Sequence, residues 1–336
     1  MIVLTRAYAK LALTMKSGLW GADNQRGGVR GSLKRNDVQH HARLDLPTMV
    51  SAASSYPSPN ALPNAEEDTT MLRRVTQLQG CTLRATDGEI GTVDQLYFDD
   101  ETWAIRYLVV NTGSWLAGRR VLISPIAVGQ TDWESQQLEV VLTKKQVEGS
   151  PDIITDKPVS RQHEAEFLRY YGYPMYWGGP YLWGSMSYPA GLATLGSVAA
   201  EASVSRAEAD SVDSHLRSTK EVTGYYIEAT DGGIGHVENF IVDLHTWAIQ
   251  YLEVNTRNWW PGKKVLISPR WIERISWMDA TVYVDLSRES IKNGPEYIES
   301  MPVSPEYEHK LWDHYKRTAD WRPGAEQPYR PTLRQD

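Results

Sequence analysis

Few side chains in this sequence could carry catalytic or metal-binding chemistry, and they are scattered. The chain has eight histidines and a single cysteine, Cys81. One cysteine excludes a disulfide within the chain and a cluster of thiolate metal ligands. His309 and His314 are five residues apart, whereas the paired histidine ligands of a helical zinc motif are four apart. We therefore expect no metal site and no bound cofactor.

Two aspartates recur in the same local sequence. Asp87 lies in ATDGEIG and Asp231 in ATDGGIG. A glycine follows each aspartate, which is typical of tight hairpin turns, because Gly adopts positive φ and Asp bonds the backbone of its own turn. We interpret both motifs as structural turns, with catalysis by the aspartates as the less favoured alternative. The turn residues are Asp87, Gly88 and Gly91 in one motif and Asp231, Gly232 and Gly235 in the other.

Common catalytic motifs do not occur in the chain. The sequence has no GxSxG, HExxH or Walker A pattern, and GEIG and GGIG fit a hairpin better than a phosphate loop. We assign no catalytic residue and expect a protein that is not an enzyme. Gly88 and Gly232 should serve folding, and at Gly88 asparagine should be tolerated better than valine because it enters the left-handed region more readily.

The spacing of the two motifs indicates an internal duplication. Residues 80–125 and 224–269 align without a gap at an offset of 144, with 25 of 46 positions identical. Both copies contain a WAIxYL run followed by VLISP. A repeat of this length predicts two domains of like fold.

Each copy has the pattern of a small β domain followed by helices. Runs rich in β-branched and aromatic residues at 93–98, 103–110 and 121–125 predict strands. Residues 160–172 and 304–315 predict helices that begin at a capping serine, and the first of them ends at a glycine. We therefore predict a mainly β protein with two tandem β-barrels in a pseudo-twofold relation, each followed by short α-helices.

Composition divides the chain into six segments. The leader is rich in Gly, Ser, Asn and Pro and is expected to be disordered, with a natural start at Met71 as an open alternative. A polar run before the second copy is expected to be a flexible linker. The segments are the leader (1–70), the first barrel (71–153), a helix with an aromatic Gly/Pro-rich stretch (154–189), the linker (190–216), the second barrel (217–297), and a helix with a polar tail (298–336).

Charge and hydropathy limit the class of partner. The chain has 42 acidic and 35 basic residues and a formal net charge of −7. This balance disfavours nucleic acid, because phosphate binding needs clustered Lys and Arg. The apolar run at residues 1–16 is interrupted by charge before it reaches the roughly 18 residues of a spanning helix. We expect a cytoplasmic protein without a transmembrane span, which could lie at the cytoplasmic face of a membrane.

Aromatic rings beside cations form a candidate interaction surface. The chain has 13 Trp and 18 Tyr but only 3 Phe, and rings with a polar end suit contacts with a partner. Burial of the same rings against the other barrel is the alternative, and we favour it. The candidate residues are Trp115, Arg119, Arg120, Trp259, Trp260, Lys263 and Lys264, with Tyr176, Trp177, Tyr181 and Trp183 from the aromatic stretch.

The repeated ATDGxIG turn, the WAIxYL strand and VLISP resemble the PRC-barrel family. This family is named for the cytoplasmic domain of the photosynthetic reaction-centre H subunit and includes a ribosome-maturation factor. The resemblance covers about residues 73–153 and 217–297, and the helical extensions are similar to soluble bacterial members with two barrels. It implies small β-barrels that act through protein contacts without a shared catalytic apparatus. Unlike the H subunit, this chain is expected to have no N-terminal membrane span.

Three functions stay open on this basis. The favoured one is a non-enzymatic adaptor or assembly factor that binds protein partners, for which the resemblance implies a photosynthetic or other electron-transfer membrane complex. The first alternative is a small-ligand or stress-related sensor with a site in the cleft between the barrels. The second, a ribosome or RNA-processing accessory factor, is disfavoured by the acidic charge. The sequence leaves the oligomeric state open.

Overall fold

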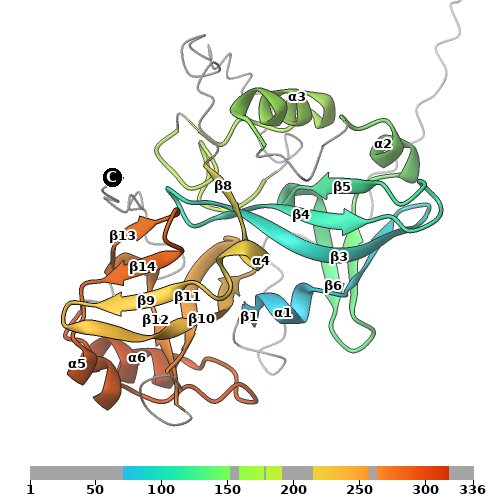
Figure 1. Ribbon diagram of the computed structural model, residues 1–336. Helices are drawn as coiled ribbons and strands as arrows, with labels where there is room; N and C mark the ends of the chain where they lie inside the picture. The colour runs from blue at the N-terminus through green and yellow to red at the C-terminus, as the bar shows by residue number, and fades with distance from the viewer. Residues whose placement is uncertain (1–70, 152–158, 178, 191–214, 257–262, 318–336) are drawn as a thin grey trace, which may run out of the picture. The chain divides into compact units, whose positions relative to one another are not determined.

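The computed structural model describes residues 71–151, 159–177, 179–190, 215–256 and 263–317 (Figure 1). The predicted leader and most of the predicted linker lie outside these residues. Among the described residues, no helix is both long enough and apolar enough to span a membrane.

The first copy forms a run of short elements around two long strands. Its elements are β1 (Leu72–Arg74), α1 (Val75–Leu78), β2 (Thr82–Ala85), β3 (Gly88–Asp99), β4 (Ile105–Asn111), β5 (Arg120–Ile123), the 3-10 turn η1 (Pro125–Ala127), β6 (Val128–Asp132), β7 (Gln137–Val140), α2 (Lys144–Glu148) and α3 (Arg161–Tyr171). Figure 1 shows β3 and β4 as the long twisted strands of this copy. The first six residues of β4 and the last four of β3 are all buried, so both faces of these strands are covered there.

The second copy repeats this order element by element. Its elements are β8 (Leu216–Ser218), α4 (Thr219–Val222), β9 (Tyr226–Ala229), β10 (Gly232–Asp243), β11 (Ala248–Asn255), β12 (Lys264–Ile267), the 3-10 turn η3 (Pro269–Trp271), β13 (Ile272–Ser276), β14 (Thr281–Val284), α5 (Arg288–Asn293) and α6 (Pro305–His314). The predicted mainly β fold with two like domains, each followed by short helices, is therefore confirmed.

The strand order explains why each sheet closes into a barrel. In the first sheet the order is β5-β4-β3-β2-β7-β6, and the second has the equivalent order β12-β11-β10-β9-β14-β13. The strands at the two ends of the order, β5 and β6, are joined only by the three-residue turn η1. The sheet must therefore curve until its ends approach each other, as a small barrel requires.

Each sheet takes its seventh strand from the other copy. β1 pairs with β10, where Leu72 lies opposite Asp243, and β8 pairs with β3, where Leu216 lies opposite Asp99. Residues 72–74, at the start of the first copy, thus complete the second sheet, and residues 216–218, at the start of the second copy, complete the first. Leu216, where the predicted linker ends, is the first residue of β8.

Two equivalent turns meet where the copies join. The N–H of Ile105 donates to the carbonyl of Trp247 at 2.7 Å, and the N–H of Ile249 donates to the carbonyl of Trp103 at 2.8 Å. Both tryptophans have φ of 58°, which is unusual for a bulky residue and costs about 1–2 kcal/mol. The bonds recur with the roles of the copies exchanged, as a pseudo-twofold relation requires.

The predicted helix caps are confirmed in both copies. The Ser160 hydroxyl accepts a hydrogen bond from the N–H of His163, and Ser304 accepts one from the N–H of Tyr307. Gly172 ends α3 with φ of 67°, the left-handed conformation that glycine adopts without a steric penalty. These caps fix where α3 and α6 begin, and so they position the faces that pack on the barrels.

The glycines of the repeated turn meet two different constraints. Gly88 has φ of +141°, and a Cβ there would meet only the Lys144 side chain at 3.5 Å. This φ lies far from the left-handed helical well near +57° that asparagine tolerates, so the expected advantage of asparagine over valine disappears. Gly91 has φ of +154°, and its Cβ would lie 2.0 Å from the carbonyl oxygen of Asn111. The close approach of β3 to β4 therefore makes Gly91 the stricter position.

We predict that Gly91→Ala destabilises the protein by about 3 kcal/mol or more, because the new Cβ must displace the β4 backbone. Gly88→Ala, where only the backbone conformation is strained, should cost about 1–2 kcal/mol. Urea unfolding of the two variants beside the parent protein measures both losses. A loss for Gly88→Ala equal to or above that for Gly91→Ala would contradict the proposed order.

Candidate functional site

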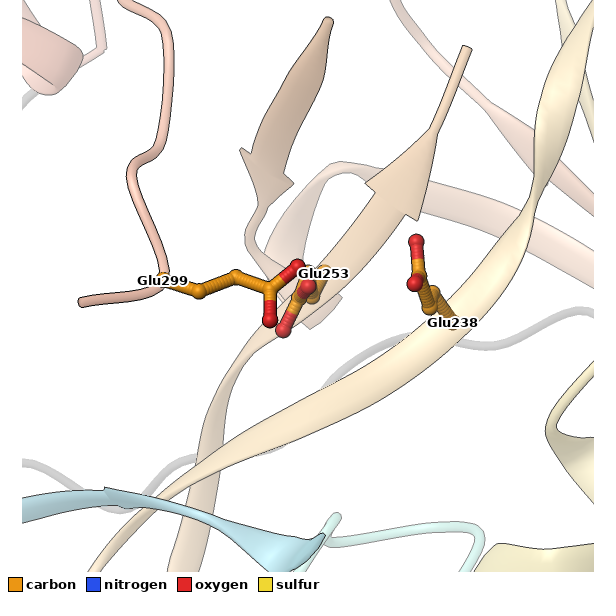
Figure 2. Close-up of side chains that lie close together, drawn as sticks. All are labelled: Glu238, Glu253 and Glu299. Carbon is orange, nitrogen blue, oxygen red and sulfur yellow. The ribbon is translucent and has the colours of Figure 1, made fainter. Parts of the chain in front are cut away.

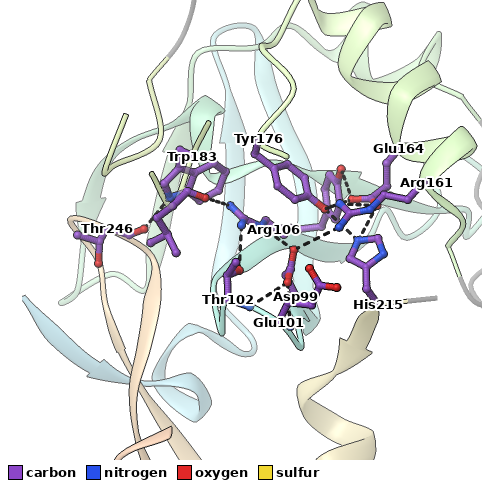
Figure 3. A network of polar contacts seen from close by, with 12 residues as sticks. Asp99, Glu101, Thr102, Arg106, Arg161, Glu164, Tyr176, Trp183, His215 and Thr246 are labelled. Carbon is purple, nitrogen blue, oxygen red and sulfur yellow. Dashed lines mark hydrogen bonds and ion pairs between the residues drawn. The ribbon is translucent and has the colours of Figure 1, made fainter. Parts of the chain in front are cut away.

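A buried carboxylate on α3 gathers polar groups from four parts of the chain (Figure 3). Glu164 is 0% exposed and accepts hydrogen bonds from the hydroxyls of Tyr107 at 3.0 Å and Tyr176 at 2.5 Å. Nε2 of His215 lies 2.9 Å from its other oxygen. Arg161, one turn earlier on α3, donates to the Tyr176 hydroxyl at 2.9 Å. The helix, β4, the aromatic stretch and the residue before β8 therefore meet at one group.

A buried arginine forms the other half of this network. The guanidinium of Arg106 lies over the rings of Tyr176 and Trp183, at 3.8 Å and 4.7 Å from their centroids. It donates to the carbonyl of Leu182 at 2.8 Å, and its Nε lies 3.7 Å from the carboxylate of Asp99. Cation–π contacts strengthen when the cation is removed from water. Arg106 therefore holds the aromatic stretch against β4.

Burial determines the protonation of the two tyrosines. Removal from water, and then the charge of Glu164, raises the pKa of Tyr107 and of Tyr176 well above the usual value for tyrosine. Both hydroxyls thus stay protonated and donate to the carboxylate. Glu164 and Tyr107 are at most 1% exposed, so a substrate could reach them only if α3 or the aromatic stretch moved. The arrangement is suited to holding segments together.

The second copy contains a reduced form of the same network. Tyr251 and Glu308, at an offset of 144 from Tyr107 and Glu164, are joined by a hydrogen bond of 2.7 Å. Burial raises the pKa of Glu308. The position of Arg106 is occupied by Gln250, whose side-chain nitrogen is buried without a hydrogen-bond partner among the described residues. The Tyr–Glu pair therefore belongs to the repeat, and the other members are specific to the first copy.

Three glutamates of the second copy lie close enough to hold a metal ion (Figure 2). Their nearest oxygens are within 4.8 Å of one another, and they are Glu238, Glu253 and Glu299. The ammonium of Lys264 contacts all three, at 2.7 Å from Glu238 and 2.9 Å from Glu253. Arg74 of β1 lies 2.9 Å from both Glu253 and Glu299. Two cations already occupy the space between the carboxylates, so the cluster acts as an ion-pair network.

Asp100 and Arg217 join the edge of the first barrel to β8. Nε of Arg217 donates to the Asp100 carboxylate at 2.8 Å, and its guanidinium lies 4.2 Å from the ring centroid of Trp277. Burial raises the pKa of Asp100 to about 6, although Arg217 opposes the shift. The neighbouring charges of Asp99 and His215 act in opposite directions on the same group. Asp100 is therefore costly to keep ionised in the folded protein.

The predicted turn aspartates each cap a helix. Oδ1 of Asp87 accepts from the N–H of Lys144, the first residue of α2, at 2.8 Å. Asp231 accepts from the N–H of Arg288, the first residue of α5, at 2.7 Å. A carboxylate at a helix N-terminus satisfies an unpaired N–H and faces the positive end of the helix dipole. The hairpin tips thus anchor the helices that follow each barrel.

The predicted cations bind within their own copies. Arg119 donates to the carbonyls of Glu148 at 3.0 Å and Ser150 at 2.7 Å, where α2 ends. Lys263 donates to the equivalent carbonyls, Lys292 at 2.6 Å and Gly294 at 2.5 Å. Arg120 lies 3.8 Å from Asp94, and Lys264 lies among the three glutamates. These side chains neutralise helix ends and carboxylates, so they do not gather into one patch.

The predicted aromatic residues are mostly inside the protein. Tyr176 and Trp183 are 5% and 4% exposed, which removes them from the candidate surface because their rings enclose Arg106. Trp177 and Tyr181 are half-buried. The half-buried Trp115 donates from its indole nitrogen to the carbonyl of Ile90, so it packs on its own barrel and not on the other one. Trp259 and Trp260 lie outside the described residues.

A hollow lies where the two copies meet. It has a volume of about 500 Å³ and is lined by residues of α1 and β3 from the first copy and of α4 and β10 from the second. Its charged lining groups are Asp94, Lys220 and Glu238. Neither this hollow nor the roles of Glu164 and Arg106 had a direct signal in the sequence. For Glu253 the signal was its difference from Val109, the counterpart in the first copy.

A comparison with protein-family models matches residues 72–147 to the PRC-barrel domain. These residues form a PRC-barrel domain. The second sheet, spanning residues 216–284, has the same strand order and indicates a tandem repeat of this domain. A comparison with curated proteins gave no match. The Tyr–Glu pair, the capping aspartates and the close approach at Gly91 and Gly235 occur in both copies.

We predict that Glu164→Gln destabilises the PRC-barrel unit by about 2–4 kcal/mol, because a neutral amide meets two tyrosine donors, Arg161 and His215 in a buried site. Glu308→Gln is the matched control in the other copy. It should cost about 1 kcal/mol, since Glu308 accepts one hydrogen bond from Tyr251. Urea unfolding at pH 7 measures both. Equal losses would show that the additional members of the first network add no stability.

We predict that Asp100→Leu, which copies Leu244 of the second barrel, changes the pH dependence of stability. A folded pKa of about 6 above the unfolded value near 3.9 means that the folded state binds the extra proton. The contribution of Asp100 is therefore present below about pH 4 and is lost as pH rises through 6. Relative to wild type, the variant should gain up to about 3 kcal/mol between pH 4 and pH 7. A constant difference in urea unfolding across this range would refute the prediction.

Proposed function

We propose that the protein is a non-enzymatic adaptor in which two PRC-barrels present one binding surface to a protein partner. The exchange of β1 and β8 supports this proposal most directly, because it joins the barrels through hydrogen-bonded sheets. Two modules held in this way bind a partner without first losing freedom of relative movement, which lowers the entropic cost of binding. Glu164 and Glu253 are each paired with a neighbouring basic side chain inside the protein, which also fits a scaffold.

A comparison of the copies indicates which surface has specialised. Met278, in the turn between β13 and β14, is 96% exposed, and Tyr226 on the adjoining β9 is 61% exposed. The N–H of Tyr226 bonds the carbonyl of Ala280, two residues after Met278, at 2.9 Å, so the two residues lie at the same end of the second barrel. The first barrel has Thr82 and Glu134 at the equivalent positions. The first barrel folds with polar residues at these positions, so folding does not require apolar ones. The exposed apolar pair of the second barrel therefore suits contact with a partner.

The proposal includes the class of partner. The family resemblance to the cytoplasmic domain of the reaction-centre H subunit supports a membrane-bound electron-transfer complex as the partner and a position at the cytoplasmic face. The net charge of −7 weighs against the ribosome and RNA-processing alternative. The second candidate function is a small-ligand sensor, which the hollow of about 500 Å³ between the copies favours.

The adaptor proposal is tested by exchanging surface residues between the copies. The variant Tyr226→Thr/Met278→Glu takes the residues of the first barrel, so it should keep wild-type stability. In affinity capture from native cells with detergent-solubilised membranes, it should recover the specific partner about tenfold less well, equivalent to a loss of about 1.4 kcal/mol. Quantitative mass spectrometry measures the recovery of each protein.

The matched control is Val141→Asp, which replaces an apolar residue that is 67% exposed with the residue of the other copy, Asp285. Capture by this variant should equal that of wild type. If the Tyr226→Thr/Met278→Glu variant captures every protein as well as wild type does, this end of the second barrel is not the contact surface. If no protein is enriched by wild type over a tag-only bait, the adaptor function fails and the sensor becomes the favoured proposal.

A further inference from the structure

The contacts that join the two copies are reciprocal. Strand β1 lies on residues 241–243 of β10, and β8 lies on residues 97–99 of β3. Arg73 of β1 and Arg217 of β8 each lie over a tryptophan of their own copy, at 5.0 Å and 4.2 Å from the ring centroids. Each copy thus gives a strand and receives one at the equivalent place.

The same reciprocity holds at the centre of the interface. The Ile105–Trp247 bond and the Ile249–Trp103 bond are equivalent at an offset of 144, and Ala104 forms a bridge with Ala248, its own counterpart. The two copies thus use the same surface patch to contact each other, with the partners exchanged. Such an interface is called isologous. This is the geometry of a C₂ homodimer.

Each long strand leaves an edge that its own copy does not fill. On one side β3 pairs with β4 along most of its length, but on the other side β2 covers only residues 88–92. The edge at residues 97–99 is then available to β8, and it is made specific by the Arg217–Asp100 pair at 2.8 Å. On β10 the corresponding edge receives β1, fixed by Arg74 and Glu253 at 2.9 Å.

We propose that these edges also pair between two copies of this chain, giving a strand-exchanged dimer. In this dimer, β1 of one chain lies on β10 of its partner, and β8 of the partner lies on β3 of the first chain. Every contact named above is kept, because none of them depends on residues 191–214 that connect the copies. In the monomer, the two barrels that pair belong to one chain. In the dimer they belong to different chains and make the same contacts, which is the condition for domain swapping.

Mass action determines when the dimer forms. Linked modules meet at an effective concentration on the order of 1 mM, so pairing within one chain dominates in dilute solution. Pairing between chains becomes competitive when the chains fold together at a similar concentration. The proposal is independent of the adaptor function, because the exchanged edges lie on β3 and β10 and the adaptor surface lies at Tyr226 and Met278.

Disulfide trapping between single-cysteine chains tests the proposal. One tagged chain carries Arg73→Cys and a second, with another tag, carries Val242→Cys, which lies directly opposite position 73 in the β1–β10 pair. The buried Cys81 is replaced by alanine in both chains. After the two chains refold together near 1 mM, non-reducing electrophoresis should show the mixed disulfide about tenfold above a control pair in which Val242→Cys is replaced by Met278→Cys.

The outcomes separate exchange from random collision. Met278 is far more exposed than Val242, at 96% against 0%, so collisional oxidation would favour the control pair. A mixed disulfide no more abundant than in this control overturns the proposal, provided that Arg73→Cys/Val242→Cys within one chain closes its internal disulfide. As a measurement without cysteines, light scattering of wild type refolded at the same concentration should show a dimer. Its absence overturns the proposal as well.

Discussion

The pairing of a three-residue strand with the long strand of the other copy is the interaction on which the rest of the structure depends. β8 brings His215 beside Glu164 and Arg217 beside Asp100. β1 brings Arg74 into the glutamate cluster of the second copy. A buried carboxylate without a partner is strongly destabilising. Loss of the exchange would thus uncover sheet edges and also leave charges in both copies uncompensated.

The duplication separates what the fold requires from what each copy has added. The Tyr–Glu pair, the aspartate that caps a helix and the cation at the helix end recur at an offset of 144. Arg106 and its aromatic enclosure occur only in the first copy, and Glu253 with Lys264 occurs only in the second. The common groups stabilise a barrel with its helices. The differing groups attach distinct neighbouring segments to similar barrels.

Much of the fold could be predicted because its causes are local or repeated. Runs of apolar residues, the capping serines and Gly172 determine the structure of the few residues around them. The gapless repeat shows the same pattern in both copies, which supports each assignment a second time. The exchange could not be predicted, because LRR at 72–74 and LRS at 216–218 are too short for a periodic signal. Their partners are also far along the chain. The roles of Arg119 and Lys263 escaped prediction for the same reason, since the carbonyls that they bind lie about 30 residues further on.

The β1–β10 pair also sets an order of events during synthesis. Strand β1 leaves the ribosome with residue 74, whereas the edge that it joins ends at residue 243. At about 5–20 residues per second, the interval is roughly 10–30 s. For much of this time, from residue 99 until β8 is complete at residue 218, the nascent first barrel has an unfilled edge at residues 97–99. The half-synthesised chain is therefore the form most exposed to sheet-mediated aggregation and most in need of a chaperone.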